Sequence, residues 1–251
     1  MASNRLRLNA SKTECMWCAT TRRQHLLDLA PIELNGSAIS PSTSVRDLGV
    51  LLSPDMSMNG HVNKVVSECF YKLRQIKTCR RSLPIPVAIS LVNCFIVSKV
   101  DYCNALLANQ PELVVGRLQS VLNAAARLIY GLRKFDHISE TIRDKLHWLR
   151  VRQRIDFKLC LIVYKSVHGL APEYINTMLQ PVNSVEARQR LRSATDGDLI
   201  VPAAKTAFGK RAFSIAATKK WNSLPPVIRA SASVGAFKRV LKTHLFKISY
   251  R

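Results

Sequence analysis

The chain has 251 residues, 47% of them hydrophobic, and a formal net charge of +22. This apolar content is enough for a packed core and excludes a disordered tail. The charge favours a polyanionic partner, RNA and/or DNA, ahead of an acidic membrane surface. Residues 59–135 hold 11 basic and 3 acidic side chains, and residues 181–251 hold 14 and 3, an excess far beyond what solubility requires.

Residues 1–57 have the pattern of short strands and turns. Asn35-Gly36 lies between the alternating segments Ile32–Leu34 and Ser37–Ile39, which is a strong β-hairpin signal. Val45–Leu52 predicts one further strand, which ends at Pro54.

From residue 59 the apolar period changes from two to about 3.6, which predicts helices. The first helix has its apolar stripe from Val62 to Ile76, and the second begins near Pro86. The third runs from about Pro111 to Tyr130 and stops at Gly131. We expect these three helices to form a compact bundle. The inward residues of the second helix are Ile89, Val92, Phe95 and Ile96.

The rest of the chain predicts a short helix near 138–146, a helix from Val151 to Val167, and a polar linker over 180–198. A short strand over Leu199–Pro202 and helices over 210–221 and 234–247 follow, the last behind the N-cap Ser233. The buried set of that last helix is Phe237, Val240, Leu241, Leu245 and Phe246. The expected fold is α+β and mostly α, with domains at 1–57, 58–134, 135–180 and 181–251.

Neither a metal site nor a cofactor is expected from the residues. Cys15 and Cys18 have zinc-like spacing but lack a second pair, so buried thiols on a strand explain them as well. The histidines are scattered, and His147 beside Trp148 is more typical of a core or capping histidine. The odd number of cysteines and the lack of a long apolar run favour a soluble intracellular protein, in the nucleus or cytoplasm, with no membrane partner.

Two basic clusters are the candidate phosphate contacts, with a solvated charged face as the alternative for the first. The second cluster surrounds Phe208, Phe213 and Trp221, whose rings either stack on unpaired bases or, for the last two, share a buried helix face. The first cluster is Lys72, Arg74, Lys77, Arg80 and Arg81; the second is Arg188, Arg190, Arg192, Lys205, Lys210, Arg211, Lys219 and Lys220.

Four segments, Leu6–Glu14, Leu146–Ile155, Phe208–Phe213 and Trp221–Pro225, carry a resemblance to a known family. Over roughly residues 6–247 the chain resembles the C-terminal part of the reverse transcriptases of LINE-type, jockey-like non-LTR retrotransposons. The resemblance implies that 1–57 is the end of a polymerase palm with a primer-gripping hairpin. It also implies that 58–134 is a thumb, which holds a primer–template duplex mainly through phosphates.

The family's catalytic carboxylates are missing from this sequence. Two-metal phosphoryl transfer needs carboxylates that converge on both ions, and no Asp-Asp pair occurs here. Lys12 stands where the family places a lysine close to the incoming nucleotide's phosphates, where it could assist the leaving pyrophosphate; the alternative is a solvated loop lysine. The cofactor of an intact parent polymerase would be Mg²⁺. We therefore expect binding of RNA and/or DNA without catalysis. Two alternatives stay open: a polymerase tail active only with its missing core as partner, and an inert fragment of a decayed element.

Overall fold

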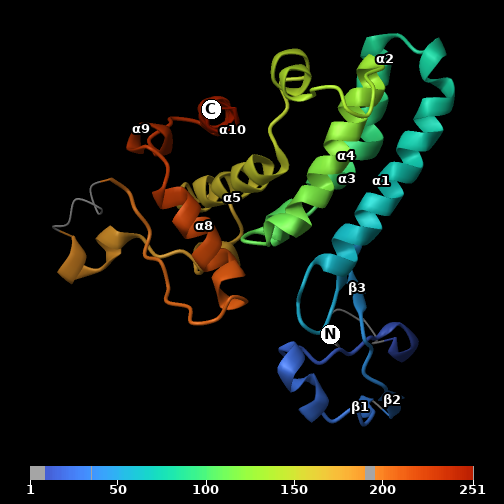
Figure 1. The fold of residues 1–251 in the computed structure, drawn as a ribbon. Helices are drawn as coiled ribbons and strands as arrows, with labels where there is room; N and C mark the ends of the chain where they lie inside the picture. Colours follow the sequence, from blue (N-terminus) through green and yellow to red (C-terminus); the bar gives the residue numbers. More distant parts are fainter. Residues whose placement is uncertain (1–8, 35, 190–195, 251) are drawn as a thin grey trace. The chain divides into compact units, whose positions relative to one another are not determined.

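The computed structural model describes residues 9–34, 36–189 and 196–250, and these fall into two compact units that divide between Lys64 and Val65. Figure 1 shows a mostly helical chain with short hairpins near its beginning. The predicted fold class, α+β and mostly α, is confirmed at this coarse level. The four domains expected from the sequence stay predictions. Within the described ranges, no helix is both long enough and apolar enough to cross a membrane.

The first unit contains the predicted Asn-Gly hairpin. Strand β1 (Ile32–Leu34) pairs antiparallel with β2 (Ser37–Ile39), with Leu34 opposite Ser37. Gly36 has φ +75, a conformation that glycine adopts without steric cost. All three residues of β1 are exposed, so neither face of this strand is covered within its own unit.

The prediction of one strand over Val45–Leu52 is wrong, because the segment folds back on itself. It forms a second hairpin, β3 (Val45–Asp47) with β4 (Val50–Leu52). The turn residues Leu48 and Gly49 have φ +44 and +86. Two successive positive φ values are typical of tight hairpin turns, but leucine is disfavoured there, so the sequence carried only half of the turn signal.

The helices of the remaining chain agree with most of the predicted elements. Helix α1 begins in the first unit, and its buried stripe of Val62, Cys69, Leu73 and Ile76 confirms the predicted period. Gly131 ends α4 with φ +67, also as predicted. The helices are α1 (Asn59–Cys79), α2 (Ile85–Val92), α3 (Ser98–Asp101), α4 (Glu112–Tyr130), α5 (Val151–Val167), α6 (Glu173–Asn176), α8 (Phe213–Asn222), α9 (Pro226–Arg229) and α10 (Val234–Ser249).

Helix α5 lies at the centre of the second unit, packed against α8 and α10. Tyr164 of α5 stacks on Phe237 of α10 with 4.2 Å between ring centroids, and Trp221 of α8 lies 5.9 Å from Phe237. All three rings are almost fully buried. The Tyr164 hydroxyl donates a hydrogen bond to the carbonyl of Ser231 at 2.6 Å, which satisfies its one polar group.

Three finer predictions are wrong. Phe95 is 48% exposed instead of inward, because residues Asn93–Val97 form a π-helical turn (η5) that shifts the helical face. Val240 is 43% exposed, since it lies beyond the edge of the stripe that α10 buries. Leu199–Pro202 does not form a strand: only Leu199 pairs, in a single antiparallel bridge with Pro181.

Candidate nucleic-acid interface

The outer surface of α1 and the turn after it carries four exposed bases, Lys72, Arg74, Lys77 and Arg81. The one acid on α1, Glu68, forms an ion pair with Lys99 of α3. Within the described ranges, none of the four bases has an ion pair with an acid. They are therefore available to bind phosphate.

Arg80, from the same predicted cluster, forms its hydrogen bonds within the protein. Its guanidinium donates to the carbonyl of Leu128 at 3.0 Å, to that of Leu83 at 2.7 Å and to that of Ile129. These carbonyls include two from the last turn of α4, which have no partner within the helix. Arg80 therefore joins the end of α1 to the end of α4, and its guanidinium is not available to bind a ligand.

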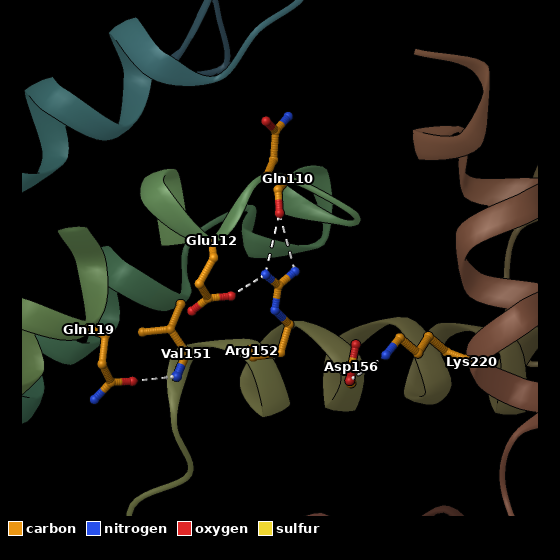
Figure 2. Close-up of polar contacts among 7 residues, drawn as sticks. All are labelled: Gln110, Glu112, Gln119, Val151, Arg152, Asp156 and Lys220. Atoms are coloured by element: carbon orange, nitrogen blue, oxygen red, sulfur yellow. Dashed lines mark hydrogen bonds and ion pairs between the residues drawn. The ribbon is translucent and has the colours of Figure 1, made fainter. Parts of the chain in front are cut away.

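The C-terminal cluster is divided in the same way. Lys205, Lys210 and Lys219 are exposed, whereas Lys220 forms an ion pair with Asp156 at 2.9 Å (Figure 2). Burial raises the pKa of Asp156, against the attraction of Lys220, so this lysine compensates a carboxylate inside the core. Arg190 and Arg192 lie outside the described residues, as does the side chain of Arg188.

The rings of this cluster also have different surroundings. Trp221 is 2% exposed, which confirms the expected burial, and Phe213 is half-buried. Phe208 is 52% exposed, and the Arg211 guanidinium lies 5.4 Å from its ring centroid. Of the three rings, only Phe208 presents a large open surface.

Helix α10 contributes a basic surface that the sequence reasoning missed. Lys238, Arg239, Lys242 and Lys247 are all exposed, and the sixteen residues of the helix include no acid. No ion pair joins any of these four to an acid in the part of the chain that the structure describes. The signal was present in the sequence as basic residues recurring at helical spacing between the apolar ones.

A hollow of about 420 Å³ brings bases of α10 and α5 together. Lys242 and Lys158 line it, beside Arg154, which forms an ion pair with Asp101 at 2.7 Å. His147 lies at the same hollow, exposed and with φ +48, so of the two expected roles, core or capping histidine, the core role is wrong. The hollow therefore has an excess of positive charge from two separate helices.

Polar contacts also fix the start of α5, as Figure 2 shows. The N–H of Val151 donates to Oε1 of Gln119 at 2.9 Å, and Arg152 donates to the carbonyl of Gln110 at 3.3 Å and to Glu112 at 2.5 Å. Like Arg80 and Lys220, Arg152 therefore binds other groups of the same protein. Exposed bases among the described residues include those of α1 and α10, Lys158 of α5, Lys205 and Lys210 before α8, and Lys219 on α8.

Two further candidates, Lys12 and Cys18, lie in the first unit. Lys12 is exposed in a 3-10 turn (Ala10–Lys12), and Cys18 is exposed rather than buried on a strand. In the described ranges, His, Cys, Asp and Glu side chains form no cluster of three that could hold a metal ion.

Comparisons with protein-family models, with curated proteins and with solved structures found no match to this chain.

Proposed function

We propose that this chain is a non-catalytic RNA- and DNA-binding protein, derived from the reverse transcriptase of a non-LTR retrotransposon, that holds nucleic acid through phosphate contacts without reading its sequence. The observation that carries the proposal is the division of the bases. Arg80, Arg152 and Lys220 are bound within the protein, while the bases of α10 and most of those at the end of α1 are exposed, with no acidic partner among the residues that the structure describes.

This division of the bases distinguishes a phosphate-binding surface from a high overall charge alone. A base already paired with a carboxylate gains little by exchanging it for a phosphate, whereas an exposed lysine releases a condensed counterion from the nucleic acid when it binds. Together, the four bases of α10 and Lys72, Arg74 and Lys77 of α1 match the number of phosphate contacts that gives strongly salt-dependent, sequence-independent binding.

The test is a salt titration of binding to a labelled RNA–DNA hybrid. One variant replaces Lys72, Arg74 and Lys77 by alanine, and a second replaces Lys238, Lys242 and Lys247. If each removed base contacts a phosphate, the slope of log K against log salt falls by about 0.9 per base, or about 2 to 3 for each triple variant.

A charge-matched control replaces Arg22, Arg23 and Arg46, which are exposed in the first unit. The control should change the slope by less than about 1. Equal losses in all three variants would mean that overall charge, and not these surfaces, determines binding. Aggregated protein, or binding that ignores salt, would support an inert fragment instead.

A second candidate function is favoured by the apolar surface of the first unit. Leu26, Leu29 and Leu48 are 71%, 68% and 82% exposed, and β1 is uncovered. Exposed apolar residues and an open strand edge are typical of a surface that another chain or domain covers. In this alternative the chain is the tail of an RNA-directed DNA polymerase and acts with a fingers-and-palm core. The test of this alternative is primer extension by such a core, measured with and without this chain. An unchanged extension rate would exclude the alternative.

A further inference from the structure

A groove of about 380 Å³ in the second unit combines exposed aromatic rings with basic side chains. Tyr71 and Phe95, 52% and 48% exposed, line it together with Lys72, Arg74 and Lys99. The volume lies within the range of about 300–1,000 Å³ that small-ligand pockets occupy. The groove therefore presents two partly exposed rings beside three basic side chains.

The π-helical turn explains how Phe95 comes to line this groove. A regular helix continuing α2 would keep Phe95 on the apolar stripe that contains Val92 and Ile96, both of which are fully buried. The wider turn over Asn93–Val97 adds a residue to the turn and brings Phe95 out beside Tyr71. Such turns cost helical stability and often lie at functional sites.

The charges of the groove favour an anion near the two rings. Lys99 forms an ion pair with Glu68, which neutralises the acid that lines the groove. Lys72 and Arg74 have no acidic partner among the described residues, so the groove keeps a positive charge.

Tyr71 is held in place by its neighbours on α1. Nε2 of Gln75 donates to the Tyr71 hydroxyl at 3.2 Å, and Nζ of Lys72 donates to Oε1 of the same Gln75 at 3.1 Å. Nζ of Lys72 also lies 5.6 Å from the Tyr71 ring centroid. The ring is thus positioned before any ligand arrives, which lowers the entropic cost of stacking on it.

We propose that this groove binds an unpaired nucleotide of single-stranded RNA or DNA, with its base against Tyr71 and Phe95 and its flanking phosphates at Lys72 and Arg74. Flat rings beside bases are the combination that single-strand binding uses, because every nucleobase has a face that can stack. A base paired inside a duplex has no free face to offer. This inference rests on the proposed function, since it names the form of nucleic acid that one part of the basic surface prefers.

The test compares a single-stranded oligothymidylate with a blunt duplex, both labelled, for Tyr71→Ala and Phe95→Ala. Each variant should bind the single strand about tenfold more weakly and leave duplex affinity within about twofold. Tyr71→Phe, which keeps the ring, should retain single-strand affinity. Phe135→Ala is the matched control, because Phe135 is 88% exposed and does not line the groove. A strand with one 2-aminopurine should lose fluorescence on binding wild type and keep it with Phe95→Ala.

The outcomes separate this inference from the proposed function. If Tyr71→Ala and Phe95→Ala bind the single strand like wild type while removal of Lys72 and Arg74 weakens both ligands, the groove holds no base and phosphate binding stands. An equal loss on both ligands would also overturn the inference, because duplex has no unpaired base. If wild type binds neither ligand, both proposals fall.

Discussion

Replacing Arg80 by alanine tests whether this base serves the fold or a ligand. Its guanidinium makes three hydrogen bonds, to the carbonyls of Leu83, Leu128 and Ile129. A hydrogen bond from a charged donor contributes about 1.5–3 kcal/mol where water cannot replace it. Arg80 is only half-buried, so water takes over part of the three bonds, and we expect a total loss of about 2–4 kcal/mol.

The assay is urea unfolding followed by tryptophan fluorescence. Trp148 and Trp221, both in the second unit, are 7% and 2% exposed, so they report its unfolding. For a unit of this size the free energy of unfolding falls by about 2–3 kcal/mol per molar urea, which gives a midpoint about 1 M lower for Arg80→Ala.

Lys77→Ala is the matched control, because it removes the same charge from an exposed position on the same helix. Its midpoint should stay within about 0.2 M of wild type, since surface substitutions seldom exceed about 0.5 kcal/mol. Arg80→Lys should not restore stability, because one ammonium does not reproduce the planar fork. The reasoning is refuted if Arg80→Ala loses less than about 1 kcal/mol, as expected of an exposed base.

Three further outcomes follow from the second unit. Phe237→Ala should lower the free energy of unfolding by about 3–5 kcal/mol, because it opens a cavity beside Tyr164. Val240→Ala, on the same helix but exposed, should lower it by less than about 1 kcal/mol. Similar losses for the two variants in urea unfolding would contradict this expectation. In the same assay, Ser233→Ala should lower the free energy of unfolding by about 1 kcal/mol, because the Ser233 side chain accepts a hydrogen bond from the N–H of Ala236 at 3.2 Å. Ser233→Asn should retain most of this stability, since asparagine also caps helices. Burial raises the pKa of Cys69 to about 11 and of Cys160 to about 12, from 9.0, so the unfolded chain loses these protons first and stability falls as the pH rises above 9.0. Ellman's reagent at pH 8 should therefore label at most five of the seven thiols until urea is added, and seven labelled thiols in the folded protein would refute the burial of these two.

The main helices could be predicted because their signals are local. The apolar stripe of α1, the glycine after α4 and the N-cap of α10 each depend on residues within a few positions. The second hairpin and the π-helical turn were missed, because Leu48 gives no turn signal and Phe95 continues a regular apolar period. In both places the backbone departs from what the local residue pattern predicts.

The candidate interface was only partly predictable, for a different physical reason. Sequence shows where bases are but not which carbonyls or acids lie near them. The partners of Arg80 at Leu128 and Ile129 are almost fifty residues away, and Asp156 is 64 residues from Lys220. The basic surface of α10 is visible in the sequence only as single bases spaced between apolar residues, whereas the bases before it form denser runs.

The start of α5 bears on how the chain folds as it leaves the ribosome. Arg150, at the N-cap, provides no side-chain cap, and Gln119 of α4 accepts the N–H of Val151 instead. Because α4 is synthesised before α5, the capping side chain of Gln119 is already present when α5 emerges. Phe237 of α10, which stacks on Tyr164 of α5, is translated 73 residues after that tyrosine. A nascent α5 therefore has its first N–H capped by an earlier helix, while its central aromatic face stays open until α10 has been synthesised.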